Sequence, residues 1–403
     1  MGNLFLVMTP QNQNTAGVKP AALKKSFIPV FVETGQGLLE ILPALQGKRR
    51  LGVDLEADSM FHFKEKVCLM QIATPDKLFI LDPLAIKDLR PLARVFADKR
   101  IQKVFHGADY DIRSLYRDFR ISVENLFDTE LACRFLGMEQ TGLEKVTYKY
   151  FGQILDKRYQ KKDWSQRPLP RRMIEYAAKD SFYLLPLAAI VRQKLKEKKR
   201  LTWVTEECEL LSRVRPAPPS STPLFFNFKG AGKLSRSSLS ILEELLRYRK
   251  QLAQQTDKPL FKIIGNHSLV TLATQAPVNL KALQKSQALS AGQLKRYGRS
   301  VLHIVQGALK RPEDELPKYP RAKSPRTKPS AALRIQRLKI WRDEKAGALD
   351  IDPALVLNKL QIFTIATQNP LRHKDLRKID ALRRWQIREF GTDILNVLHA
   401  ESH

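Results

Sequence analysis

The sequence predicts a mixed α/β domain followed by two small all-α domains. Across residues 28–212, short apolar segments with the composition of strands alternate with helical segments, a pattern typical of a mixed sheet covered by helices. Two proline-rich stretches, within 213–232 and 311–330, divide the chain into three parts, because proline cannot continue a helix. Each of the last two parts opens with an amphipathic helical pattern.

The elements of the first domain follow from composition and periodicity. Strands are expected at 30–34, 49–58, 67–73, 77–83 and 103–107, with helices at 37–45, 87–98 and 111–119 and mainly helix from there to about 212. The predicted division of the chain is an N-terminal tail at 1–27, the α/β domain at 28–212, a linker at 213–232, a helical domain at 233–310, a second linker at 311–330 and a second helical domain at 331–403.

The two helical domains are expected to be copies of one unit. Each has a proline in the loop after its first helix and an aromatic residue near its last, short helix. Pro259 and Pro353 are 94 residues apart, and Tyr297 and Phe390 are 93 apart. This near-constant offset favours a duplication over two unrelated helical segments.

The chain carries a large excess of positive charge. It has 70 lysines and arginines against 41 acidic residues, which gives a formal net charge of +29. A surface of this kind attracts polyanions and binds phosphate backbones by releasing counterions. The charge favours a nucleic-acid-binding function, although it does not distinguish RNA from DNA and also suits a merely basic, ribosome-associated protein.

Several classes of protein are disfavoured. Cys68, Cys133 and Cys208 form no C-x-x-C pair, which argues against structural zinc and suits a reducing compartment. No signal peptide and no run of about 18 apolar residues is found, so a cytoplasmic protein without a membrane partner is expected. The GAGK sequence within 228–235 lacks P-loop spacing, so no nucleotide cofactor is expected. The sequence identifies no protein partner.

Two acids in the second predicted strand form the first candidate site. Asp54 and Glu56 are two residues apart and therefore share a face of the strand, while Val53 and Leu55 face the core. Neighbouring carboxylates repel each other unless a cation lies between them, and Mg²⁺ and Mn²⁺ prefer carboxylate oxygen. The alternative is a solvated acidic strand end.

A second group of candidates lies where the strand ending in His106 and Gly107 turns into a helix. Asp109 is expected to cap that helix or to lie on the surface, whereas Asp111 is expected to project into a cleft. His106 is expected to be packed or hydrogen-bonded rather than a metal ligand, since no second histidine is suitably spaced.

The third group is a helical pair, Tyr176 and Asp180, which share one face at i and i+4. Alone it fits an ordinary helix, but four carboxylates from three elements are expected to converge at one edge of the sheet. Two metal ions held there would activate water and stabilise the leaving oxygen in phosphodiester cleavage. A tyrosine with an ordinary pKa of about 10 suits positioning of that water rather than proton abstraction.

These motifs resemble the tyrosine-bearing branch of the DEDD exonuclease superfamily, and most closely the ribonuclease D family. The family pattern is D-x-E, an aspartate after an HxAxxD-like turn, and Y-x-x-x-D, matched here by Asp54, Glu56, Asp111, Tyr176 and Asp180. The stretches KEKVCLMQIA, LDPLA, NLFDTELACRFLG and DWSQRPL also look like the family. The resemblance extends over residues 28–212.

The resemblance implies a ribonuclease H-like fold with a mixed five-stranded sheet flanked by helices. It also implies two divalent metal ions, Mg²⁺ or Mn²⁺: one bound by Asp54, Glu56 and Asp180, the other by Asp54 and Asp111. Leu55 stands where the family often has threonine, and Arg171 and Arg172 stand where it often has polar or acidic residues. The two arginines and His106 are therefore candidate substrate-binding residues.

The two helical domains resemble HRDC domains, which follow the exonuclease domain of ribonuclease D in the same order. The first copy matches better, at LRYRKQLAQQTDKPLFKII, and it contains Lys258, a further candidate substrate-binding residue. The second copy lacks the usual aromatic after its proline. The implied role is guidance of a 3′ end to the active site; the alternative is stability or protein contact alone.

Three functions stay open at this point. The resemblance implies a 3′→5′ exoribonuclease that releases nucleoside 5′-monophosphates and trims the 3′ ends of transfer RNA precursors and other small structured RNAs. A DNA exonuclease with the same site is the first alternative, and a non-catalytic RNA-binding protein is the second. The HRDC pair and the DWSQRPL stretch favour RNA, and the presence of all five motif residues argues against a decayed site.

Overall fold

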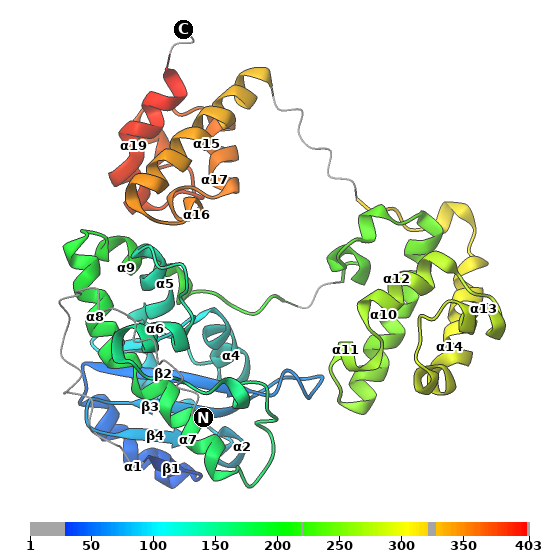
Figure 1. Cartoon of the computed structure of the whole chain (residues 1–403), viewed down its shortest axis with the longest axis horizontal. Coiled ribbons are helices and arrows are strands. Elements are labelled where there is room, and N and C mark those ends of the chain that lie inside the picture. The colour runs from blue at the N-terminus through cyan, green and yellow to red at the C-terminus, as the bar shows by residue number, and fades with distance from the viewer. Residues whose placement is uncertain (1–28, 219–220, 321–327, 401–403) are drawn as a thin grey trace, which may run out of the picture.

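The computed structural model describes residues 29–218, 221–320 and 328–400 (Figure 1). The N-terminal tail predicted at 1–27 lies outside the described residues. Among those that are described, no helix is both long enough and apolar enough to cross a membrane.

The α/β domain is built on a mixed six-stranded sheet in the order β1-β4-β3-β2-β5-β6. The strands are β1 (Val30–Val32), β2 (Arg50–Ala57), β3 (Val67–Ala73), β4 (Leu78–Leu81), β5 (Gln102–Phe105) and β6 (Leu126–Asp128). β3 is antiparallel to both β2 and β4, and the other pairs are parallel. The predicted fold class is confirmed, with six strands rather than five. The additional strand is β6, which falls in the stretch expected to be mainly helix and is followed directly by α5 (Thr129–Phe135).

Helices flank this sheet. They are α1 (Gly35–Gln46), α2 (Pro83–Ile86), η2 (Arg90–Leu92), α3 (Ala93–Ala97), α4 (Asp109–Phe119), α5 (Thr129–Phe135), α6 (Leu143–Phe151), η3 (Lys157–Tyr159), α7 (Arg171–Phe182), α8 (Leu184–Glu197) and α9 (Leu201–Leu211). α7 packs against β2, β3 and β4, and α8 packs against β2 and β5. Gly52 permits this close approach, because a Cβ there would lie 3.1 Å from Leu184 Cβ and 3.4 Å from Ser181 O. On the opposite face, Val53 and Leu55 enter the main hydrophobic core, as predicted.

The two helical units repeat the same order of helices. The first contains α10 (Arg236–Thr256), α11 (Leu260–Ile263), α12 (Asn266–Gln275), α13 (Leu280–Lys285) and α14 (Ala291–Leu309); the second contains α15 (Pro329–Leu349), α16 (Pro353–Val356), α17 (Lys359–Gln368), α18 (His373–Leu376) and α19 (Arg384–His399). Each helix of the second unit begins 93 residues after its counterpart. The closing helices have 19 and 16 residues and are not short, contrary to expectation.

The first helical unit begins earlier than predicted. Phe225, Phe228 and Ala231 are buried in its core, although they fall within the predicted linker at 213–232. They lie in or beside two short 3₁₀ segments, η4 (Leu224–Asn227) and η5 (Ala231–Lys233), which carry no helical periodicity for a sequence pattern to reveal. Tyr319, in the second predicted linker, packs onto the same core. We therefore propose that this unit extends from about residue 223 to about 320.

The second helical unit shares one continuous hydrophobic core with the α/β domain. The indole of Trp385 stacks on Trp203 of α9 with 4.7 Å between ring centroids. Glu206 accepts hydrogen bonds from the backbone N–H groups of Arg384 and Trp385 at 2.6 and 3.0 Å, and thereby caps α19. Glu207 accepts from the indole N–H of Trp385 at 2.9 Å. One glutamate of the α/β domain thus caps a helix of the second unit, and the next holds its buried indole.

The first helical unit is attached differently, through the loop that joins β2 to β3 (Figure 1). Asp257, at the end of α10, accepts hydrogen bonds from His62 Nδ1 at 2.7 Å and from the backbone N–H of Phe63 at 3.1 Å. Phe63 packs on the core of that unit, and the Lys262 ammonium lies 4.3 Å from the centre of the Phe61 ring. These contacts join a loop of the α/β domain to the end of α10 and to α11.

The shared core predicts that Trp385 stabilises the α/β domain. Trp385→Ala is expected to lower the free energy of unfolding by about 3–5 kcal/mol, because the indole is fully buried. Hydrogen exchange measured by mass spectrometry should increase in α9 as well as in α19. Leu360→Ala is the control, since that side chain is 64% exposed on the same unit. Unchanged protection of α9 in Trp385→Ala would contradict a shared core.

Candidate active site

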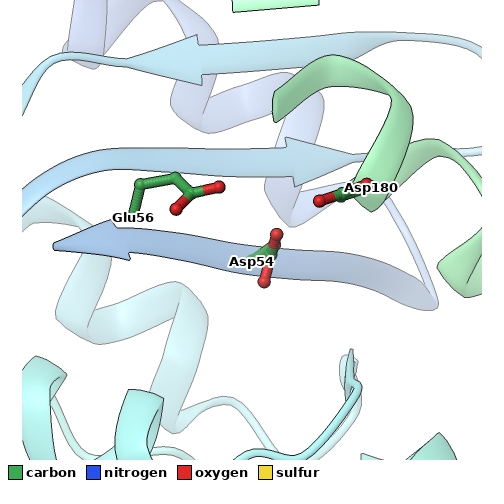
Figure 2. A group of neighbouring side chains, drawn as sticks. All are labelled: Asp54, Glu56 and Asp180. Atoms are coloured by element: carbon green, nitrogen blue, oxygen red, sulfur yellow. The ribbon is translucent and has the colours of Figure 1, made fainter. Parts of the chain in front are cut away.

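Three carboxylates meet above β2. Asp54 and Glu56 lie on the same face of that strand, and Asp180 reaches them from α7 (Figure 2). One oxygen of each lies within 4.8 Å of the others. Because α7 is held on this face by its contacts with β2, β3 and β4, the arrangement is fixed by the packing of the domain.

The electrostatics of this trio fit a divalent cation. Removal from water, followed by the charge of Asp180, raises the pKa of Asp54 to about 7. Burial also raises the pKa of Asp180 to about 6, and burial with repulsion from Asp54 raises that of Glu56. No basic side chain of the described residues offsets these effects at the three acids. A hard divalent ion is the partner that an uncompensated group of carboxylate oxygens prefers.

Asp111 forms the edge of the same site. It lies in the first turn of α4 with 8% of its surface exposed, and burial, then the charge of Asp54, raise its pKa. It is not one of the three acids whose oxygens lie within 4.8 Å. The turn before α4 is held by Asp128, which accepts the backbone N–H groups of Gly107 and Ala108 at 2.9 and 2.8 Å.

Asp109 is exposed and is not part of the group of three acids. Its side chain forms an ion pair with Arg113 at 2.8 Å, one turn along α4, and it makes no capping hydrogen bond. The surface position predicted for Asp109 is confirmed, and the capping role is wrong. The reason is that α4 begins at Asp109 itself, one residue beyond the N-cap position.

Tyr176 lies one turn before Asp180 and is buried between aromatic rings. The centres of Tyr159 and Trp164 lie 5.8 and 6.0 Å from its ring centre. Burial, the charge of Asp180 and a hydrogen bond to that carboxylate raise the pKa of the phenol. The hydroxyl therefore stays protonated near neutral pH and is suited to donate a hydrogen bond, not to remove a proton.

A small cavity of about 140 Å³ opens beside Tyr176 and Asp180. Its other lining residues come from the start of α6 and from the segment around η3: Gly142, Leu143, Glu144, Leu155, Asp156, Lys157 and Gln160. Lys157 forms an ion pair with Glu144 across the cavity wall. Sequence reasoning missed this lining, because a loop without periodicity or motif gives no signal of what it faces.

None of the four predicted substrate-binding residues lines this cavity. His106 is hydrogen-bonded through Nδ1 to Thr129 Oγ1 at 2.9 Å, which confirms that it is a hydrogen-bonded residue. Arg171 and Arg172 are exposed at the start of α7, where Arg171 pairs with Glu175 at 3.0 Å. Lys258 is exposed beside Asp257, where the first helical unit meets the α/β domain. Their substrate roles stay predictions.

Comparison with known proteins identifies relatives over nearly the whole chain. Residues 29–196 match the family described as 3′-5′ exonuclease, and residues 238–305 and 332–398 each match the HRDC domain. The two HRDC matches confirm the predicted duplication. Ribonuclease D of Acidiphilium cryptum (strain JF-5) is 28% identical over 372 residues, which cover 92% of this chain and 93% of that protein.

Two solved structures are also similar to this chain. The catalytic core of RRP6 from Trypanosoma brucei is similar at 30% identity and a TM-score of 0.62, over 70% of this chain and 80% of that one. Escherichia coli RNase D shares the fold with a TM-score of 0.69 at 23% identity, over 94% of this chain and all of that one.

The uncompensated carboxylates predict a cation-dependent increase in stability. Millimolar Mn²⁺ should raise the melting temperature of the wild-type protein by several degrees, since a ligand at 100 times its Kd stabilises by about 2.7 kcal/mol. Asp54→Asn should abolish most of this increase while leaving the cation-free protein at least as stable, because one repelling charge is removed. Asp109→Asn is the control and should respond like wild type. Equal Mn²⁺ responses in Asp54→Asn and wild type would rule out this site.

Proposed function

Because the chain belongs to the ribonuclease D family, with a 3′→5′ exonuclease domain and two HRDC domains, we propose that it removes nucleotides one at a time from the 3′ end of RNA. The observation that supports this best is the meeting of Asp54, Glu56 and Asp180 without a basic partner among the described residues. In a protein that only binds RNA, such a group of carboxylates would weaken binding, because it repels phosphate.

Asp54, Glu56 and Asp180 would hold one divalent ion, Mg²⁺ or Mn²⁺, and Asp54 with Asp111 would hold a second. When bound, such ions lower the pKa of a water molecule and stabilise the negative charge on the leaving 3′ oxygen. The carboxylates of Asp54 and Glu56 lie on one face of β2, so they would hold such ions there.

Tyr176 orients the attacking water through its phenolic oxygen, which accepts a hydrogen bond from that water while its own O–H donates to the Asp180 carboxylate. Attack on the last phosphodiester bond leaves the phosphate on the departing nucleotide, so the product is a nucleoside 5′-monophosphate. The aromatic packing around Tyr176 holds the ring in place without the need for substrate.

The cavity beside Tyr176 is where we place the terminal nucleotide. Leu143 and Leu155 offer apolar contact to a ring, and Lys157 and Gln160 offer polar contact to its edge or to phosphate. Because the cavity is small, the 3′ end must be single-stranded and splayed out to enter it. Lys258 and the arginines at 171 and 172 then contact the strand outside the cavity.

We propose that the substrates are transfer RNA precursors and other small structured RNAs with a single-stranded 3′ end. Escherichia coli RNase D is described as an exoribonuclease involved in structured RNA processing. The two HRDC domains supply further basic surface for the structured part of such an RNA. A DNA substrate would use the same chemistry and is the second candidate.

The proposal predicts a metal-dependent ladder. A 5′-labelled single-stranded RNA should shorten from its 3′ end with Mg²⁺ or Mn²⁺, and EDTA or Asp54→Asn should stop the reaction. A DNA oligomer of the same sequence, run in parallel, should be cut more slowly. Equal or faster cleavage of DNA would assign the enzyme to DNA, and no cleavage of either would leave a binding function.

Tyr176→Phe separates positioning of water from binding of cations. Loss of the hydroxyl should lower kcat about 10²-fold or more, the usual scale for a positioned group in proton-transfer chemistry. The Mn²⁺-induced rise in melting temperature should persist, because the carboxylates are unchanged. Tyr159→Phe, at the neighbouring ring, is the matched control and should retain activity. A Tyr176→Phe enzyme with normal kcat would remove the tyrosine from the mechanism.

A further inference from the structure

Gln71 is a buried polar residue in an otherwise apolar strand. It lies in the centre of β3, whose other residues are Val, Cys, Leu, Met, Ile and Ala. Its side chain is fully buried, and neither the amide nitrogen nor the amide oxygen has a hydrogen-bond partner among the described residues. Among the described residues, no other buried side chain has two polar atoms that both lack a hydrogen-bond partner.

The register of the sheet places Gln71 beside Asp54. In the antiparallel pair of β2 and β3, Asp54 is directly opposite Gln71, and Gly52 is opposite Ala73. Directly opposed residues point to the same face, with Cβ atoms about 4.5–5.5 Å apart. The Ala73 Cβ does lie 3.5 Å from a Cβ placed on Gly52, on the face that α7 covers. Gln71 therefore lies under α7 on the face that carries the carboxylates.

A buried amide without partners is costly, since it has lost its hydrogen bonds to water and gained none. An apolar residue of similar size would serve the core of this strand better. The polar groups on this face next to Gln71 are the carboxylates of Asp54 and its neighbours, and these are also without a compensating charge. The amide lacks hydrogen-bond partners, and the carboxylates beside it lack a compensating positive charge. A hydrated cation bound between them would supply both.

We propose that Gln71 is a positioning residue of the cation site: its carboxamide, which has no partner in the structure, hydrogen-bonds the water shell of a divalent cation and the Asp54 carboxylate once that cation is bound. A carboxamide suits this task, because its N–H groups donate to carboxylate oxygen while its carbonyl accepts from water. It also carries no charge of its own, so it adds no repulsion to the acids. The inference rests on the proposed function, since it assumes that the carboxylates bind a cation.

Gln71→Leu tests this proposal through cation binding. Groups that hold a metal ligand in place typically contribute 10–100-fold in affinity, so the Kd for Mn²⁺, measured by electron paramagnetic resonance of the free ion, should rise about tenfold or more. The cation-free melting temperature should be equal to or above that of wild type, because an unpaired buried amide has been removed. A purely structural role would give a lower melting temperature and an unchanged Kd.

Two further variants keep the result interpretable. Met70→Leu changes the adjacent residue, which points to the opposite face, and should leave Mn²⁺ affinity as in wild type. Gln71→Met keeps the length of the side chain without its hydrogen bonds and should behave like Gln71→Leu. On RNA, both Gln71 variants should lower kcat at 0.1 mM Mn²⁺ with KM for RNA unchanged within twofold.

The outcomes separate this inference from the proposed function. If wild type binds no Mn²⁺ at all, the proposed cation site itself is wrong. If wild type binds Mn²⁺ and Gln71→Leu and Gln71→Met bind it within twofold of the same Kd, the assignment of Gln71 is overturned while the carboxylate site stands.

Discussion

The packing of α7 on β2, β3 and β4 is the interaction on which the site depends, because it holds Asp180 beside Asp54 and Glu56 in spite of their mutual repulsion. Like charges removed from water separate unless the surrounding structure holds them, and here two of them come from one strand and the third from a helix packed on it. The apolar side chains on the other face of β2, Val53 and Leu55, anchor that strand in the main core. The stability of the core thus opposes the repulsion among the three acids.

The two helical units have unequal relations to this domain. The second unit is joined to it through a stacked pair of tryptophans, Trp203 and Trp385, and through the Glu206 carboxylate, which caps its last helix. The first unit contacts the β2–β3 loop through Asp257, through Lys262 and through the packing of Phe63 on its core. Since that loop is continuous with the strand that carries Asp54 and Glu56, RNA bound by the first unit would lie at the end of the catalytic strand.

The sequence predicted which acids share a face, because residues two apart lie on one face of a strand and residues four apart lie on one face of a helix. Asp54 and Glu56 lie on one face of β2, as alternation along a strand requires, and Tyr176 and Asp180 lie one helical turn apart on α7. Two features were not predicted: β6, which leads directly into α5 and so lies in a stretch expected to be helical, and the 3₁₀ segments around Phe225, which have no periodicity. The lining of the cavity by Lys157 and Gln160 depends on tertiary packing, which spacing along the chain does not encode.

The central claim is that these carboxylates hold divalent ions at the point where the 3′ end of RNA is cut. Crystals of the protein with Mn²⁺ and a short single-stranded RNA, measured at the manganese absorption edge, test it most directly. The account predicts anomalous density between Asp54, Glu56 and Asp180 and a second peak between Asp54 and Asp111, with the terminal nucleotide beside Tyr176. Manganese bound elsewhere, or an RNA 3′ end remote from Tyr176, would contradict it.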